Sequence, residues 1–418
     1  MAEIAQDQPS QEALLAKVVE IRGHIIDSLI LPRILDEVMD LGGEFTIQAI
    51  EVGRQKHEPS YARLEVRAPT REILTGILER IERLGATPLE EVDATVEPAP
   101  RDAVFPPDFY STTSLDTEVR LDGRWTPVQF PEMDCGILVS ADRTSACCIP
   151  INDVIKGDLM VVGRQGMRVL PVERPRTPSP AFAFMGSAIS PEKPKGVMVA
   201  DIAEKIRALR QEEKNVLVVA GPAVVHTGGG EHLARLIEMG YVQNLFAGNA
   251  LAAHDIEWAF YGTSLGIFLE RGEPLEGGHQ HHLRAINNIR LAGGMAEAVR
   301  KGILTKGVMY TCIRKGVPFI LAGSLRDDGP LPEVITDVIK AQSAMREAIR
   351  KGVDFCLMLS TMLHSIATSN LLPGHVPIVC VDINPAVVTK IMDRGGLQAV
   401  GLVMDVGSFL RELELHLK

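Results

Sequence analysis

Small, hydroxyl and acidic residues follow a series of apolar runs in the second half of the chain. The run 216–220 leads to a bend at Gly228-Gly229-Gly230, and the next run leads to Gly248-Asn249-Ala250. A helix that begins at such a bend presents free backbone N–H groups and the positive end of its dipole, which favours a phosphate. Later runs end at Arg326-Asp327-Asp328, Ser360-Thr361-Met362-Leu363, Asp382 and Asp405-Val406.

These run ends are compatible with a dinucleotide. A carboxylate at the end of a strand, such as Asp382, can accept hydrogen bonds from both ribose hydroxyls, which favours NAD over NADP. Neither G-x-G-x-x-G nor the P-loop spacing is present. An ordinary tight turn at Gly228–Gly230 and a helix cap at Asp382, ahead of Pro385, therefore stay open as alternatives.

His254 and Glu257 are spaced i and i+3, so a helix would place them on one face, where they could act as an acid/base pair. The alternative is an ion-paired helix start that uses Asp255 and Glu257. Several other histidines occur nearby. His279 and His282 would share a helical face, but no cysteine or carboxylate follows at a usual zinc spacing. A polar face or subunit contact is favoured there, and no metal is predicted.

Composition narrows the class of protein. The 418 residues are 46% hydrophobic and carry a net charge of −11, which argues against nucleic acid and anionic membrane surfaces as partners. None of the six cysteines forms a C-x-x-C pair, and a reducing compartment fits them. No signal pattern and no apolar run of about 18 residues is present, so a cytoplasmic protein is expected.

The elements that must position these residues form three predicted domains. Residues 15–97 read β-α-β-β-α-β, a ferredoxin-like α+β domain whose last strand is expected at 89–96. Residues 101–174 are β-rich, with a hairpin turn at Asp122-Gly123. Residues 175–196 read as a linker. Residues 197–418 alternate strands and helices, including a helical region at about 279–302, and predict a parallel, Rossmann-like sheet.

Long motifs in the chain resemble a known family. They are FYSTTSLDTEVR, PEMDC, VAGPAVVHTGGGEHLARLI, GNALAAHDIE, YGTSLG, LRDDGPLPEV, MLSTMLHSIATSN and VCVDINPAVVTKI. The chain resembles the family with the conserved region of the lysine-oxoglutarate reductase/saccharopine dehydrogenase bifunctional enzymes. Within it, the chain is most similar to the NAD-dependent ornithine cyclodeaminases of archaea and to the C-terminal part of the cyanobacterial arginine dihydrolase/ornithine cyclodeaminases. The C-terminal half also resembles the deoxyhypusine-synthase type of Rossmann-like domain.

The resemblance implies conversion of L-ornithine to L-proline and ammonia with bound NAD. It places cofactor contacts at Asn249, Ala250, Asp328, Ser360, Thr361, Met362, Leu363, Asp382, Asp405 and Val406. The arginine-dihydrolase domain of the cyanobacterial fusion has no counterpart, so arginine is not an expected substrate.

Residue roles are hypotheses at this stage. Asp328, Glu257 and His254 are the catalytic candidates, and Thr113 and Asp134 are expected to close the substrate cleft. An amino-acid dehydrogenase that releases NADH and a NAD-sensing regulatory module stay open as other functions. A homo-oligomer is expected, and a tetramer formed through the Rossmann-like domain is one candidate form.

Overall fold

The computed structural model describes residues 14–26, 28–54, 58–82, 84–88, 92–170, 195–268, 278–327, 329–395 and 399–418. The chain divides into two compact units, Met1–Ser179 and Pro180–Lys418. Most of the predicted linker, residues 175–194, lies outside the described residues. Within the described ranges, no helix is both long enough and apolar enough to cross a membrane.

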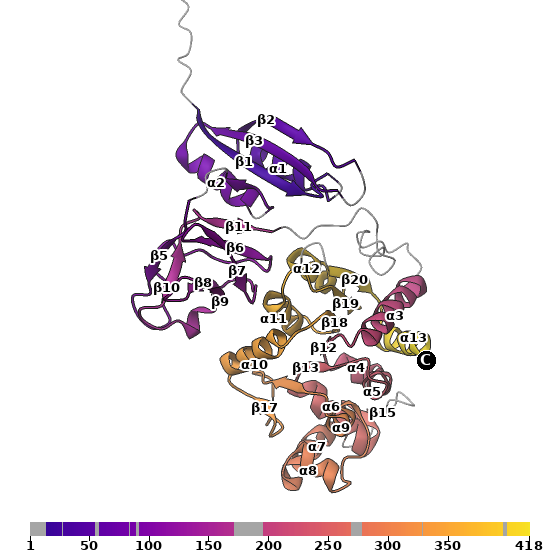
Figure 1. The fold of residues 1–418 in the computed structure, drawn as a ribbon. Coiled ribbons are helices and arrows are strands. Elements are labelled where there is room, and N and C mark those ends of the chain that lie inside the picture. The colour runs from indigo at the N-terminus through magenta and orange to yellow at the C-terminus, as the bar shows by residue number, and fades with distance from the viewer. Residues whose placement is uncertain are drawn as a thin grey trace, which may run out of the picture. The chain divides into compact units, whose positions relative to one another are not determined.

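The first part of unit one is a four-stranded antiparallel sheet in the order β2-β3-β1-β4, packed against two helices (Figure 1). Alternate residues of β3 are buried, so one face of the sheet forms a core with the helices. Thr70 caps the second helix by accepting a hydrogen bond from the Ile73 N–H at 3.3 Å. The elements are β1 (Leu15–Gly23), α1 (Ile30–Asp40), β2 (Glu44–Glu51), β3 (Ser60–Ala68), α2 (Arg71–Glu82) and β4 (Thr87–Pro88).

The last strand of this sheet differs from the prediction at 89–96. The strand that completes the sheet is the short β4, and the next strand, β5 (Thr95–Pro98), pairs with β10 (Leu159–Val162) in the following sheet. Alternation of side chains reveals a strand but not its partner. The chain therefore passes into the β-rich part earlier than its pattern indicated.

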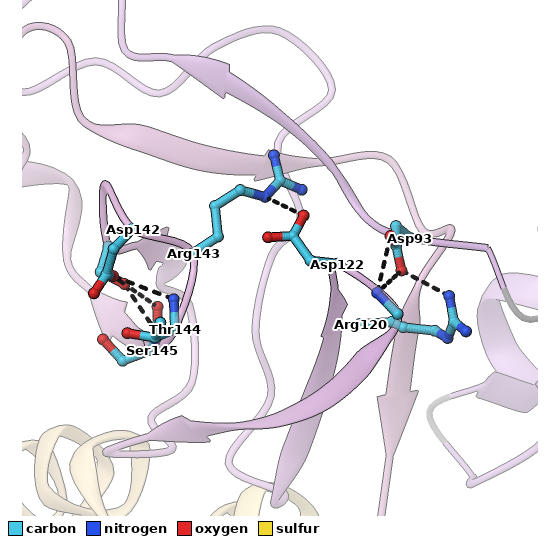
Figure 2. A network of polar contacts seen from close by, with 9 residues as sticks. Asp93, Arg120, Asp122, Asp142, Arg143, Thr144 and Ser145 are labelled. Atoms are coloured by element: carbon cyan, nitrogen blue, oxygen red, sulfur yellow. Dashed lines mark hydrogen bonds and ion pairs between the residues drawn. The ribbon is translucent and has the colours of Figure 1, made fainter.

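The β-rich part is a seven-stranded sheet in the order β11-β6-β7-β9-β8-β10-β5. Its predicted hairpin is confirmed: Asp122 and Gly123 have φ of 47° and 79°, which suits a tight turn between β6 and β7. Figure 2 shows Asp93 facing this hairpin, where its carboxylate accepts hydrogen bonds from Arg120 and from the Gly123 N–H. The remaining elements are β6 (Thr117–Leu121), β7 (Arg124–Gln129), β8 (Gly136–Val139), β9 (Ala146–Ile149), η1 (Ile151–Asp153) and β11 (Met167–Val169).

Unit two contains a seven-stranded, wholly parallel sheet in the order β17-β16-β13-β12-β18-β19-β20, as the prediction required. Helices cover both faces, because Val216 and Val218 of β12 pack in one core and Leu217 and Val219 in the other. The strands are β12 (Val216–Ala220), β13 (Asn244–Gly248), β16 (Phe319–Ala322), β17 (Val334–Ile335), β18 (Phe355–Leu359), β19 (Ile378–Asp382) and β20 (Ala399–Val403). The hairpin strands β14 (Thr263–Ser264) and β15 (Ile267–Phe268) lie outside this sheet.

The helices divide between the two faces (Figure 1). One face carries α3 (Lys195–Gln211), α5 (Gly230–Glu238), α6 (Asn249–Tyr261) and α13 (Val406–Leu417). The other carries α10 (Val338–Arg350), α11 (Leu363–Leu371) and α12 (Pro385–Gly395). The shorter helices include α4 (Ala223–His226) and α9 (Val308–Lys315).

The predicted helical region 279–302 is interrupted in the structure. It consists of η3 (Gly278–Gln280), α7 (His281–Ala292) and α8 (Met295–Arg300). Gly293 and Gly294 have φ of 95° and 116° and end α7, because a left-handed backbone cannot continue a right-handed helix.

The strand order creates a switch point at the centre of the sheet. From β12 the chain proceeds to β13, β16 and β17 on one side, and then returns to β18, β19 and β20 on the other. The loops after β12 and β18 thus leave the sheet in opposite directions. Ligands of open parallel sheets bind in the crevice outside the carboxyl ends at such a point.

Candidate active site at the carboxyl edge of the parallel sheet

The two loops at the switch point approach each other closely. A Cβ on Gly221, directly after β12, would lie 2.1 Å from the backbone oxygen of Ser360, directly after β18. Glycine is therefore required at position 221. Ser360 itself has φ of 49°, an uncommon conformation for a residue that is not glycine, and such residues concentrate at functional sites.

The segment β18–α11–β19 has the organisation of a mononucleotide-binding unit. Helix α11 begins at Met362 without a side-chain cap, so its first N–H groups face outward. Asp382 ends the next strand, about 20 residues beyond the loop, which is the usual place of a ribose-binding carboxylate. One of its oxygens accepts a hydrogen bond from the Asn384 N–H at 2.8 Å. The other oxygen makes no hydrogen bond to the described residues.

Helix α6 brings Asn249 and Ala250 to the same edge. Its N-terminus also lacks a side-chain cap. The Asn249 side chain is buried and accepts a hydrogen bond from the Leu331 N–H at 3.0 Å, which secures the loop after β16. The N–H groups of the first turn are open to an anion, whereas Asn249 Oδ1 is engaged by Leu331.

Exposed apolar side chains surround this edge. Met362 and Leu363 follow β18, and Ile383 follows β19 directly after Asp382; their side chains are 43%, 73% and 70% exposed. Exposed apolar side chains of this kind provide surfaces for flat aromatic rings.

Asp405 and Val406 occupy a different environment. The Asp405 carboxylate accepts a hydrogen bond from the Ser408 N–H at 2.7 Å and so caps α13. Val406 is the first residue of that helix and is buried. Any contact from this pair to a cofactor would have to use the remaining Asp405 oxygen or the backbone.

His254 and Glu257 meet as their spacing predicted. His254 Nδ1 lies 2.8 Å from Glu257 Oε2, and the Glu257 side chain is completely buried. A carboxylate only accepts hydrogen bonds, so Nδ1 of His254 carries a proton and donates it to Glu257, which leaves Nε2 as the ring nitrogen that can meet another partner. His254 lies little more than one turn after the open N-terminus of α6.

Further donors saturate the Glu257 carboxylate. Thr263 Oγ1 and the Gly266 N–H donate to Oε1 at 2.9 and 3.0 Å, and the Leu265 N–H reaches Oε2 at 3.3 Å. Burial acts to raise the pKa of Glu257, but the hydrogen bonds from His254, Gly266 and Thr263 outweigh it and lower the pKa. The buried group is held as a carboxylate.

Two more histidines extend this network. Thr263 Oγ1 donates its one hydrogen bond to Glu257. His281 Nδ1 lies 2.8 Å from Thr263 Oγ1 and must therefore be the donor to that oxygen. The His226 ring lies edge-on to the His254 ring, with 4.8 Å between the ring centres, and His226 Nδ1 lies 2.7 Å from Ser264 Oγ. Burial, with a smaller effect of His254, lowers the pKa of His226 to about 4, so His226 is neutral near pH 7.

Asp255 has a structural role that separates it from its neighbours. Its two oxygens accept hydrogen bonds from the Val308 and Met309 N–H groups at 2.8 and 2.9 Å, which caps α9. Burial raises the pKa of Asp255 to about 6 against the effect of these hydrogen bonds. The alternative of an ion-paired start of α6 is thus wrong for Asp255, which serves another helix.

Three predicted site residues are not brought into this arrangement by the described structure. Asp328 lies outside the described residues. Thr113 and Asp134 belong to unit one, where Thr113 Oγ1 accepts a hydrogen bond from the Leu115 N–H at 3.3 Å and Asp134 is exposed with φ of 62°. Their roles stay predictions.

Sequence reasoning missed His364. A Cβ on Gly248 would lie 2.9 Å from His364 Cε1, so this ring packs against the start of α6. Burial lowers the pKa of His364, against an opposing effect of Asp327. The sequence could have indicated His364, because this residue directly follows the predicted Ser360–Leu363 loop. The partnership of His226 with Ser264 had no comparable signal in the spacing.

The doubly covered parallel sheet, with open helix N-termini and Asp382 at its switch point, defines a Rossmann-type dinucleotide-binding protein. Comparison with known families agrees. Residues 200–413 match the Rossmann-fold C-terminal domain of ArgZ-like arginine dihydrolases, residues 116–199 match the first region of that C-terminal part, and residues 16–115 match the conserved region of LOR/SDH bifunctional enzymes.

Individual relatives extend over nearly the whole chain. An ornithine cyclodeaminase of Methanopyrus kandleri is 53% identical over 96% of this chain and 97% of its own, and one of Methanocaldococcus jannaschii is 52% identical over 95% of each. The chain belongs to this ornithine cyclodeaminase family with an LOR/SDH conserved region and ArgZ-like domains.

Solved structures match as well. The cyanobacterial arginine dihydrolase ArgZ aligns over 99% of this chain with a TM-score of 0.84 and 39% identity. A ternary complex of AgrE with ornithine and NAD+ aligns over 97% with a TM-score of 0.52 and 43% identity. The matched part spans 60% of the ArgZ chain and 57% of the AgrE chain.

Proposed function

We propose that this protein is an NAD-dependent ornithine cyclodeaminase that converts L-ornithine to L-proline and ammonia. The observation that carries the proposal is the oriented His254–Glu257 pair, placed just inside a helix N-terminus at the dinucleotide-binding edge of the sheet. The reaction has no net redox change, since the hydride removed from the substrate is returned to the product. Relatives with this name over the same length support the assignment.

The residues at the switch point fit NAD. Gly221 and Gly248 allow backbone approach that any Cβ would block. The open N-termini of α6, at Asn249 and Ala250, and of α11, preceded by Ser360 and Thr361, suit the two phosphates. Asp382 suits an unphosphorylated ribose, with Met362, Leu363 and Ile383 beside the rings. Bound there, NAD supplies the hydride acceptor and donor.

The remaining chemistry is proton transfer, which we assign to His254. Its Nδ1 is committed to Glu257, so Nε2 is free to take a proton from a substrate ammonium group. Glu257 acts as a positioning residue that fixes the tautomer and stabilises the protonated ring. Neutral His226 at the ring edge adds no competing charge when His254 is protonated.

The δ-ammonium of ornithine requires a carboxylate, and Asp328 is our proposal for that group. Thr113 and Asp134 are proposed to complete the substrate cleft from unit one, and Asp405 and Val406 to border the cofactor. A homo-oligomer, with a tetramer as one candidate form, and a cytoplasmic location are proposed as well. The free thiols of all six cysteines, each among the described residues, support a reducing compartment.

Incubation of the purified protein with L-ornithine and NAD tests the proposal. The expected result is stoichiometric proline and ammonia with no net NADH absorbance. Accumulating NADH would instead establish an amino-acid dehydrogenase. NAD binding without turnover of any diamino acid would instead support a regulatory module. The His254–Glu257 pair favours an enzyme over that module.

A further inference from the structure

Unit one contains a partly open pocket with a cavity volume of about 250 Å³ that the proposed reaction does not use. It lies where β1 and α2 meet the β7 strand and the turn before β11. Its lining combines cationic, acidic and apolar side chains. The lining includes Lys17, Thr75, Leu78, Glu82, Trp125 and Arg164.

Part of the lining is charged. Glu82 Oε2 lies 3.3 Å from Arg164 Nη1, and the two side chains are 14% and 31% exposed. Arg164 also lies 3.3 Å from Glu79, which is outside the lining. Lys17 contributes a second cationic side chain to the lining. The cavity therefore offers both signs of charge close together.

The apolar part of the lining is held in place. It includes Trp125, Leu78, Val92 and Met167. The guanidinium of Arg168 lies 4.3 Å from the centre of the Trp125 ring, and Asp93, beside Val92, is anchored to the β6–β7 hairpin (Figure 2). The wall is thus preorganised, which lowers the cost of binding a ligand.

We propose that this cavity binds a free α-amino acid with an apolar side chain, its ammonium on Glu82, its carboxylate on Arg164 and its side chain against Trp125. The size agrees, because the volume lies just below the roughly 300–1,000 Å³ of sites for drug-sized ligands. A phosphate would meet Glu82 as a like charge, and a purely apolar molecule would leave the ion pair without new partners.

The electrostatics of Glu82 support an incoming ammonium. Burial raises the pKa of Glu82 to about 7, although Arg164 acts to lower it. The carboxyl is consequently only partly ionised near neutral pH. An ammonium at hydrogen-bonding distance would complete its ionisation, so binding should release a fraction of a proton to the solvent.

Isothermal titration of the full-length protein with L-leucine, L-valine and L-proline tests the proposal. Saturable binding of at least one is expected, with inorganic phosphate inert. Glu82→Gln should weaken it about tenfold or more, through loss of a charge-assisted hydrogen bond. Thr75→Phe, at an exposed lining position, should fill the space and abolish binding. Glu79→Gln, which also touches Arg164 but not the cavity, should change affinity less than about twofold.

Absence of saturable binding for all three amino acids would overturn the proposal. Equal affinity in Glu82→Gln, Thr75→Phe and wild type would also overturn it, since the amino acid would then bind elsewhere. Ornithine turnover measured on the same variants shows that they are folded. That turnover depends on no residue of this cavity, so either proposal can fail without the other.

Discussion

Glu257 in unit two and Glu82 in unit one are both buried glutamates, and they ionise in opposite ways. Glu257 is completely buried, yet its pKa is lowered, because His254, Thr263 and two loop N–H groups donate to it. Burial raises the pKa of Glu82 to about 7, because Arg164 is its one hydrogen-bond donor among the described residues. The comparison teaches that several hydrogen-bond donors can outweigh the effect of burial on a carboxyl, as at Glu257, whereas a single donor does not do so at Glu82.

The different surroundings of Glu257 and Glu82 suit different functions. A carboxylate with all its acceptor sites filled is fixed and can only orient its neighbour, which suits a positioning role beside His254. A carboxyl with unfilled acceptor sites responds to what arrives, which suits a binding site. Replacing each glutamate with glutamine should therefore have different consequences.

The largest effect is expected for Glu257→Gln. The amide would put a donor where His254 now donates, so the ring would lose its orientation and its stabilising charge. Proline formation should fall by about 10²–10⁴-fold, the usual contribution of general acid–base catalysis. Steady-state kinetics should show the loss in kcat, with NAD affinity within about twofold of wild type. If Glu257→Gln kept the kcat of the wild type, Glu257 would have no positioning role, and its contrast with Glu82 would not hold.

For Glu82 the expected effect is on stability and its pH dependence. The folded protein binds the proton of Glu82 more tightly than the unfolded chain does. The resulting contribution to the free energy of unfolding is present below pH 4.5 and is lost as the pH rises through about 7. The loss amounts to about 3 kcal/mol, from a pKa difference of about 2.5. Wild type should therefore lose stability relative to Glu82→Gln over this range. Thermal unfolding of both proteins across the range measures the difference, and a constant difference would contradict the raised pKa.

Asp382 is a third carboxylate, with one oxygen engaged by the Asn384 N–H. Asp382→Asn should weaken NAD binding about tenfold, because the ribose hydroxyls lose a charged acceptor. Asp405→Asn is the matched control at the end of the neighbouring strand; asparagine caps a helix about as well as aspartate, so it should change stability little and affect NAD binding less. Equal losses of NAD affinity, measured by fluorescence titration, would place Asp405 on the cofactor as well.

The smallest effect is expected for Ser264→Ala. It removes the partner of His226 Nδ1 without touching Glu257. Loss of one hydrogen bond is worth about 1 kcal/mol, so turnover should fall only a few-fold if the ring shifts. A loss as large as that of Glu257→Gln would show that His226, rather than the His254–Glu257 pair alone, carries the proton transfer.

Local patterns in the sequence were enough for much of this molecule. Near-continuous apolar runs between helices determined a covered parallel sheet, because a strand buried on both faces has no polar side. The i, i+3 spacing brought His254 to Glu257, and the strand ends gave Asp382 and the Ser360 loop. Motif resemblance added the family, which spacing alone did not reach.

Only the tertiary structure decided what depends on contacts between distant segments. It paired β5 with a strand of the second sheet and brought the Asp255 carboxylate to the first N–H groups of α9. It also placed His226 beside His254 and brought Glu82 and Arg164 together in the lining of one cavity. The physical reason is that periodicity reports which face of an element is buried but not against what. The number of donors around a buried carboxyl, and hence its charge, is set by partners that the linear sequence does not pair.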